Sequence, residues 1–326
     1  MRPLLCTSLV SLLPLMAGAE IYIPRIWPTA RIAGVVGAVT ALSDGIETAL
    51  WNPAGFGALC GIGASGTLCD WTPALANEIK YQFAAAGIGV PNLLPGNRSL
   101  GFGLSYAYFD QGMLTNSWGV QYHAWERLAG VHCGVSVLPR LRVGLAAKLI
   151  SAHAEGLTRS TLAADLGCTY KAFRFLDAGF ELANLGKSLA FLEGYVRSMP
   201  TEIRFALAVT PLDNSLFRVR LLPEFDYTLA RPMAGRIKDV SSLRLGAEAT
   251  LIQYFSARYG RVIETDYDGL LRQKTGLSIG IGYMDYVRLE FSSEWLNASG
   301  AESATGKFSL ALNDVVGLVR ELGKGI

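Results

Sequence analysis

The sequence predicts an all-β fold: a transmembrane antiparallel β-barrel of about 14 strands, with an N-terminal helical plug in its lumen. Three observations predict it: an export signal at the N-terminus, strand-length segments with a two-residue period, and a mean hydropathy of +0.30 with no apolar run long enough for a spanning helix. With 51% hydrophobic and 17% charged residues, the chain is neither disordered nor a coiled coil. A formal net charge of +2 gives no basic footprint for nucleic acid.

Residues 1–19 have the three parts of a secretory signal peptide. Arg2 supplies the positive charge, Leu4 to Met16 forms the apolar region, and Ala17-Gly18-Ala19 is a small-x-small cleavage site. We expect export and cleavage after about Ala19. The alternative, an N-terminal anchor helix, is disfavoured because a spanning helix needs ~20 apolar residues.

Residues 20–59 differ from the rest, because they alternate poorly and are rich in small residues. We expect a helix-turn-helix plug here. Gly34 and Gly37 permit close backbone approach, and Ser43-Asp44-Gly45 is expected to make a turn that caps the next helix. Pro53 forces Asn52 out of the helical region, so Asn52 is expected to bond to its neighbours as a turn former. The alternative is a periplasmic extension without a gating role.

From about residue 97 onward, apolar residues alternate with small or charged ones. In the segment from Phe102 to Tyr108 the intervening residues are small, whereas in that from Leu243 to Leu251 they include Arg244 and Glu248. Such alternation predicts strands with two chemically different faces. The remaining segments of this kind are 118–125, 131–138, 141–153, 162–173, 178–185, 203–209, 217–227, 277–283, 287–292 and 308–312.

Two architectures use such strands: a soluble β-sandwich and a membrane barrel. The barrel is favoured because the non-lipid face carries glycine, serine and opposed charges, whereas a sandwich surface would be richer in lysine and glutamate. Aromatic residues near segment ends suit the two interfacial girdles of a barrel. They are Tyr106, Tyr108, Trp118, Trp125, Tyr227, Tyr283, Tyr286 and Trp295.

The barrel is assigned to residues 60–313. Roughly 18 to 20 residues per strand and connection give 12 to 14 strands, each with the ~9–11 residues of a tilted span. We choose 14, an even number, although the region 230–274 leaves the count open by one segment. Residues 314–326 form a short tail, for which Asp314 and the spacing of the valines predict a helix.

The plug carries the pattern R-x-x-G-x-x-G-A-x-x-A-x-x-D-G, followed after five residues by W-N-P-A-G. This resembles the N-terminal region of FadL/TodX-type outer-membrane transport proteins, and is most similar to the smaller branch with the PorV/PorQ-like and spirochaete FadL-like proteins. The residues that carry the resemblance are Arg31, Gly34, Gly37, Ala38, Asp44, Gly45, Trp51, Asn52, Pro53, Ala54 and Gly55.

The resemblance implies a 14-stranded barrel in which this stretch is a hatch. FadL-type barrels pass hydrophobic molecules such as long-chain fatty acids, whereas PorV-like members are partners in protein secretion. The chain is short for a fatty-acid transporter of this type. We therefore expect long ligand-gathering loops to be missing.

Charged residues at lumen-facing positions have two interpretations. Arginines there suit a carboxylate or phosphate head group, but carboxylates of the same parity would neutralise them in an internal network, and the network is favoured. Arg31 of the plug is expected to join a lumen carboxylate. The candidate lumen charges are Arg204, Arg218, Arg220, Glu224, Asp226, Arg244, Glu248, Arg288 and Glu290.

No catalytic residue, metal site or cofactor is predicted. The chain has three histidines, His123, His132 and His153, without G-x-S-x-G or metal-ligand spacing. Cys60 and Cys69 would lie about 30 Å apart on an extended chain, beyond disulfide reach. Cys133 and Cys168 fall inside predicted strands, and the disulfide status of all four stays open.

The sequence thus predicts an exported outer-membrane channel for hydrophobic small molecules, gated by the hatch. Its expected partners are a fatty acid or similar amphiphile and outer-membrane lipid, and no nucleic acid. The alternative is a PorV-like interaction protein that serves secretion or surface attachment. An apolar pocket beside the plug favours transport, whereas a filled lumen with exposed apolar loops favours a protein partner. A general porin fits less well because its lumen is aqueous.

Overall fold

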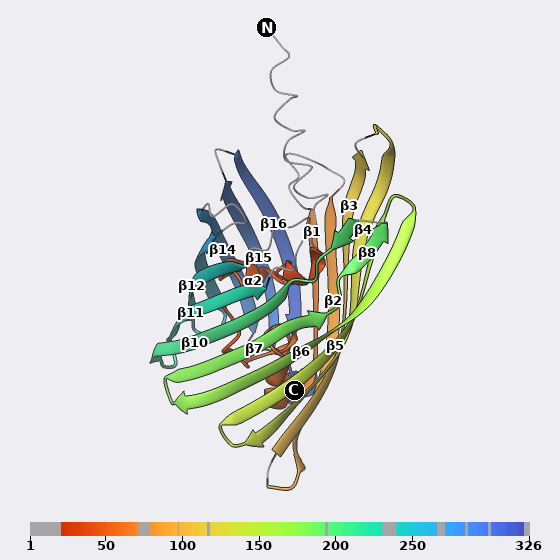
Figure 1. The fold of residues 1–326 in the computed structure, drawn as a ribbon. Coiled ribbons are helices and arrows are strands. Elements are labelled where there is room, and N and C mark those ends of the chain that lie inside the picture. Colours follow the sequence, from red (N-terminus) through yellow and green to blue (C-terminus); the bar gives the residue numbers. More distant parts are fainter. Residues whose placement is uncertain are drawn as a thin grey trace.

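The computed structural model describes residues 21–70, 79–96, 98–115, 118–192, 195–229, 239–265, 271–283, 286–298 and 301–322. Fourteen antiparallel strands close into one barrel in which β1 pairs with both β2 and β16 (Figure 1). The predicted fold class and the choice of 14 strands are therefore confirmed. The proposed signal peptide, residues 1–19, lies outside the described residues. No helix in the described part of the chain is long and apolar enough to cross a membrane.

The barrel strands follow the chain in order, except that a small hairpin separates the seventh from the eighth. They are β1 (Gly61–Asp70), β2 (Lys80–Leu94), β3 (Arg98–Thr115), β4 (Gln121–Leu138), β5 (Leu141–Ala154), β6 (Leu157–Phe173), β7 (Leu176–Gly186), β10 (Thr201–Asp213), β11 (Phe217–Leu229), β12 (Val240–Leu251), β13 (Phe255–Thr265), β14 (Leu271–Tyr283), β15 (Val287–Ala298) and β16 (Ala301–Leu312). The hairpin is β8 (Leu189–Leu192) and β9 (Tyr195–Arg197).

The structure corrects the assignment of strands in two places. The segments 118–125 and 131–138 are not separate strands, because β4 runs without a break from Gln121 to Leu138. Trp118 precedes the strand, in a turn. Strands β1 and β2 lie before residue 97, where glycine and alanine on both faces hide the alternation. The segment that the sequence left undecided in the region 230–274 is strand β13.

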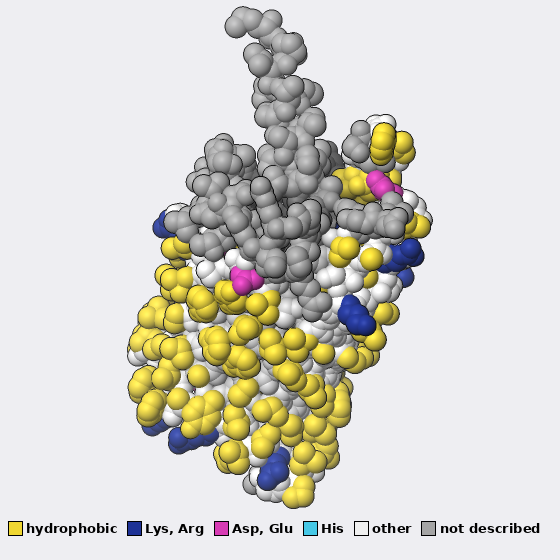
Figure 2. Space-filling view, in the orientation of Figure 1, with side chains coloured by type: hydrophobic (Ala, Val, Ile, Leu, Met, Phe, Trp, Pro, Cys, Tyr) yellow, Lys and Arg dark blue, Asp and Glu magenta, His cyan; other side chains and the backbone are white. Residues whose placement is uncertain are grey.

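The two faces of the wall differ as a membrane barrel requires. Large apolar side chains point outward, and they cover the wall in Figure 2. On β3 the outward residues Phe102, Leu104 and Tyr106 are about half exposed or more, whereas the intervening glycines face the interior. Inside lie charged and small residues. This arrangement is the reverse of a soluble sandwich, whose outer face is polar.

The N-terminal segment places four short helices in the lumen: η1 (Ile23–Arg25), α2 (Ala30–Gly34), α3 (Ile46–Trp51) and η2 (Pro53–Ala58). They lie inside the ring of strands in Figure 1, coloured red to orange. Helix α2 packs against β13 to β16, and η2 packs against β2 to β6, so the plug touches opposite sides of the wall. After the last strand, α4 (Val315–Leu322) begins beside Asp314, whose Oδ1 accepts a hydrogen bond from Gly317 N at 3.0 Å.

Candidate functional site

The plug sits against glycines of the wall. A side chain at Gly144 or Gly134 would collide with the backbone of Pro53, and one at Gly101 or Gly103 would collide with Phe56. Gly34 of the plug makes the reciprocal contact, because a Cβ there would meet Ser278 of β14. Many of the chain's 36 glycines thus face the lumen, where they leave room for backbone-to-backbone packing of the plug.

Asn52 ties the plug to two strands. Its backbone is extended, at φ −120° and ψ 111°, as the following proline predicts. Its Oδ1 accepts from Ala54 N at 3.1 Å, which caps η2. Its Nδ2 donates to the carbonyl of Thr40 at 2.7 Å, and lies 3.3 Å and 3.4 Å from those of Cys168 and Phe180 on β6 and β7. The side chain therefore acts beyond its local turn.

Helix α3 follows the segment Ser43-Asp44-Gly45 as expected, but its first amide is held by a residue far along the chain. The N-cap of α3 is Gly45, and the first amide of the helix, Ile46 N, donates to Asn313 Oδ1 at 2.9 Å. The two carboxylate oxygens of Asp44 instead accept hydrogen bonds from the two terminal nitrogens of Arg31, at 2.9 and 2.8 Å. Both oxygens of Asp44 thus accept from the buried guanidinium of Arg31 in a charge-assisted pair.

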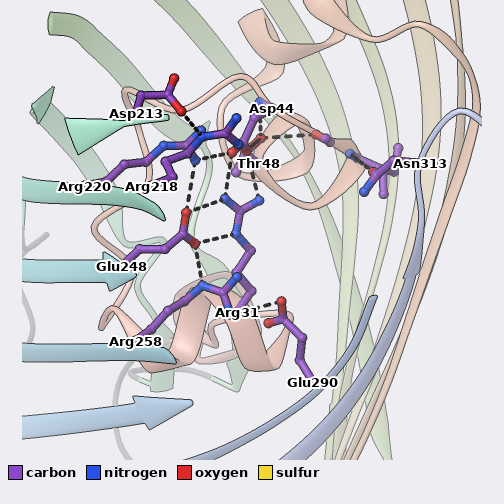
Figure 3. A network of polar contacts seen from close by, with 12 residues as sticks. Arg31, Asp44, Thr48, Asp213, Arg218, Arg220, Glu248, Arg258, Glu290 and Asn313 are labelled. Carbon is purple, nitrogen blue, oxygen red and sulfur yellow. Dashed lines mark hydrogen bonds and ion pairs between the residues drawn. The ribbon is translucent and has the colours of Figure 1, made fainter. Parts of the chain in front are cut away.

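Arg31 joins the plug to the wall in a network of charges (Figure 3). Its Nε lies 3.2 Å from Glu248 Oε2 on β12. Glu248 also contacts Arg220 at 3.0 Å and Arg258 at 2.5 Å, and Arg220 returns to Asp44. Arg258 continues to Glu290 of β15 at 3.0 Å. The arginines thus meet carboxylates of the protein itself, as the network interpretation expects.

A second group of charges lies beside it on β7, β10, β11 and β12. Arg204 contacts Glu181 at 2.7 Å and also Glu202, and its guanidinium lies 4.1 Å from the centre of the Trp51 ring of the plug. Arg244 contacts Glu224 at 2.9 Å and also Asp226. Glu224 Oε2 in turn accepts from Thr40 N of the plug at 3.0 Å.

Two of the predicted lumen charges, Arg218 and Arg288, are less buried than the ion pairs described above. Arg218 at the start of β11 pairs with Asp213 at the end of β10 at 2.9 Å, and the two side chains are 27% and 55% exposed. Arg218 lies on the lumen-facing side of its strand, as expected, but it lies at the rim of the barrel, where its side chain is partly exposed to water. Arg288 is half-buried, and it acts electrostatically on Asp44 and Glu47 of the plug.

The other residues of the hatch motif are packing positions. Gly37 has φ +82°, a conformation that favours glycine, and a side chain there would meet Trp27. Ala38 is buried in the core cluster with Trp27 and Trp51. Gly45 lies against Asn313, and Gly55 against Ala49. Ala54 is fully buried.

Sequence reasoning missed the carboxylate that holds the start of the plug. Glu126 Oε2 accepts from Tyr22 N at 2.8 Å and from Ile23 N at 2.7 Å. Its other oxygen contacts Arg197 of the β8–β9 hairpin at 3.0 Å. Glu126 lies on the lumen-facing side of β4, but the predicted segment 118–125 ended one residue before it. Continuing the alternation through β4 would have found it.

A small cavity with a volume of about 60 Å³ lies between the plug and the wall, whose lining residues come from β2 to β5 and from β7 and β10. Its apolar lining includes Ile23, Ile26, Leu50, Tyr81, Phe83 and Leu128. Its polar lining includes His132, Lys148, Glu181 and Arg204. Lys148 is paired with Asp165 at 2.5 Å, and His132 Nε2 is 2.9 Å from Ser105 Oγ. The polar groups that reach the cavity are thus bonded to the wall.

Neither a metal cluster nor a disulfide is present in the described ranges. No three histidine, cysteine or acidic side chains there converge as metal ligands. Cys60, Cys69, Cys133 and Cys168 are free thiols.

Solved structures with a similar fold include proteins of two Pseudomonas species. A FadL homologue of Pseudomonas aeruginosa has a TM-score of 0.55 at 10% identity, covering 88% of this chain and 98% of that chain. The toluene transporter TodX of P. putida has 0.52 at 11% identity, covering 82% and 94%. A TodX deltaS2S3 mutant, described as a monoaromatic hydrocarbon channel, has 0.56 at 10% identity, covering 87% and 97%.

No protein-family model and no curated protein matches the sequence. At this level of identity, the likeness to solved structures concerns the fold. The barrel, its strand number and its N-terminal plug agree with that likeness. The chain has the fold of the FadL/TodX-type outer-membrane transporters.

Proposed function

We propose that this protein is an outer-membrane channel that passes small hydrophobic molecules when the plug is displaced. Long-chain fatty acids and monoaromatic hydrocarbons both belong to that class. The cavity between plug and wall is the observation that carries the proposal, because it places an apolar lining in the lumen, beside the element that must move.

The size of the cavity supports displacement of the plug. An engineered apolar cavity that binds benzene has a volume of roughly 150 Å³. The 60 Å³ found here is less than half of that, so even one aromatic ring needs the plug or its neighbours to move. The short helices of the plug suit such a movement, whereas its buried ion pairs with the wall oppose it.

The apolar outer wall supports the membrane location. On β5 the outward residues from Leu141 to Leu149 are apolar, which is the ~9–11 residues of a tilted membrane span. Turns between β2 and β3, β4 and β5, and β12 and β13 are short, as are those at the periplasmic end of bacterial barrels. We therefore place this end toward the periplasm.

The alternative of a secretion partner predicted a filled lumen with exposed apolar loops. The cavity fits transport better, and a plugged lumen also fits a general porin poorly. Transport by this route needs no cofactor and no covalent chemistry.

Uptake into liposomes tests the proposal. Purified barrel is reconstituted, and entry of a fluorescent fatty acid and of toluene is followed, with sucrose as a polar control. The double variant Asn52→Ala, Pro53→Ala loosens the plug where it bonds to β6 and β7. We expect faster entry of the hydrophobic probes with the barrel than without it, and a changed rate in the variant. Equal entry with and without the barrel refutes the channel.

A further inference from the structure

The outer surface of strands β3 to β6 changes sharply from apolar to polar. Cross-strand pairing places Tyr106, Ala129, Leu149 and Leu162 side by side on the outer face. Two residues further along each strand, the paired residues are Tyr108, Arg127, Ser151 and Ser160, of which Arg127 and Ser160 are exposed, Tyr108 is half-buried and Ser151 is buried. We call this second set the boundary row. On the side of this row nearer the middle of the strands, the outer wall is apolar. We therefore take the row as the edge of the membrane span.

Arg127 is the charged member of the boundary row. Its side chain is exposed, and its cross-strand neighbours Tyr108 and Ser151 are uncharged. Asp110, the nearest acidic position on β3, is 2.7 Å from His123 Nε2 and accepts from Gly112 N at 2.9 Å. Among the described residues, the contact shown for the Arg127 guanidinium is with an aromatic ring, so its N–H groups remain open to a ligand at the surface.

An aromatic platform fixes the direction of that edge. The guanidinium carbon of Arg127 lies 5.0 Å from the centre of the Trp125 ring, and the His153 ring stacks on Trp125 at 5.4 Å with 6° between planes. His153 is itself held, since its Nδ1 is 2.9 Å from Thr158 Oγ1. The guanidinium is planar, and packing over an indole face restricts how that plane is turned, so that a pair of its N–H groups can meet two oxygens of a phosphate.

We propose that Arg127, supported by Trp125 and His153, binds the phosphate of an anionic membrane lipid. The acyl chains of that lipid would lie over the row of Tyr106, Leu149 and Leu162, where Leu162 is 70% exposed. The positive charge of Arg127 and its position at the edge of the apolar wall match a lipid headgroup. The apolar residues beside it match the acyl chains. The inference rests on the proposed membrane location, and it is independent of transport.

Lipid retention tests the site. The barrel in nonionic detergent is given equal phosphatidylglycerol and phosphatidylcholine, and retained lipid is counted by native mass spectrometry. A basic residue near an anionic surface predicts about a fivefold preference for phosphatidylglycerol. Arg127→Gln should abolish the preference, and Trp125→Leu, which keeps the charge but removes the platform, should reduce it. Circular dichroism checks that both variants keep the barrel.

Arg98→Gln is the matched control, because Arg98 is also exposed but begins β3 at the short-turn end. We expect it to keep the preference. Equal loss in Arg98→Gln and Arg127→Gln would show diffuse attraction and overturn the site. Displacement of the lipid by millimolar glycerol 3-phosphate would assign the site to a soluble phosphate and overturn the lipid. Uptake of hydrophobic probes is measured separately, so failure of the site and failure of the channel are distinguishable.

Discussion

Arg31 lies between Asp44 of the plug and Glu248 of β12, with 1% of its side chain exposed. Removing one partner of a buried ion pair costs about 3–5 kcal/mol, because the remaining charges stay buried. We expect Arg31→Ala to weaken the seating of the plug by this amount. Backbone amides of residues 30–51 should then exchange with deuterium at least about 100-fold faster, since each tenfold corresponds to about 1.4 kcal/mol.

Arg218→Ala is the control for that experiment. The Arg218–Asp213 pair lies at the rim and is largely open to water, so its loss should cost less than about 1 kcal/mol. If Arg31→Ala leaves exchange in the plug as slow as Arg218→Ala does, the network does not hold the plug.

Glu47 of α3 predicts a pH dependence of the plug. Burial, and then the negative charge of Glu290, raise the pKa of Glu47 from 4.5 to about 7, although Arg31, Arg288 and Thr29 act to lower it. When the pKa of a carboxyl group is raised in the seated plug, ionisation of that group destabilises the seated state. The seated state is therefore favoured below about pH 4.5 and weakened as pH rises to about 7, by on the order of 3 kcal/mol.

Glu47→Gln removes this titration. We expect the variant to raise the thermal unfolding midpoint at pH 8 and to change it little at pH 4.5. An equal change at both pH values would mean that Glu47 does not ionise in this range.

At the residue scale, the sequence predicted which plug residues matter better than what they do. The proline-driven geometry of Asn52 is local, so it could be predicted. The ion pair of Asp44 with Arg31 and Arg220 depends on strands far away in the chain, and a turn with the sequence Ser-Asp-Gly is by itself a good capping signal. The helix follows that turn as expected, but its first amide is held by Asn313, far along the chain.

At the scale of elements, η2 is positioned by glycines on the five neighbouring strands β2 to β6. A Cβ at Gly144 would collide with the carbonyl carbon of Pro53. We expect Gly144→Ala to displace η2 and to destabilise the barrel by about 1–3 kcal/mol, the usual cost of overpacking. The shift in the denaturation midpoint measures it.

Gly66→Ala is the matched variant, because the nearest atom to a Cβ there is the carbonyl oxygen of Phe83 at 3.7 Å, an ordinary contact. Its midpoint should stay near that of the unmodified protein. Equal midpoints for the two variants would contradict close packing of η2.

Strands were predictable where the two faces differ in chemistry, as in β12 and β15. Strand β2 contains Ala84, Ala85 and Ala86 in succession, so no period is visible although Ala85 faces inward and its neighbours outward. Strand β4 was divided because Ala129 and Gly130 interrupt its apolar pattern. The β8–β9 hairpin has no period of its own, and its place is set by the contact of Arg197 with Glu126.

At the scale of the whole molecule, the high apolar content and the two-residue alternation were enough to predict the barrel, because together they indicate strands with an apolar outer face. The cavity could not be predicted, because it is what remains between plug and wall after both have packed. The central claim is that this plug must move for a hydrophobic molecule to pass.

A disulfide lock tests that claim most directly. A Cβ at Gly63 of β1 would lie 3.2 Å from Cβ of Ile46 on α3, close to the ~3.5–4.5 Å of disulfides. The variant Ile46→Cys, Gly63→Cys is made with Cys60→Ser, which removes an exposed thiol, and Ile46→Cys alone is the control. We predict that oxidation reduces toluene and fatty-acid uptake into liposomes to the protein-free rate, and that dithiothreitol restores it. Uptake at the full rate through the oxidised, locked barrel would contradict the account.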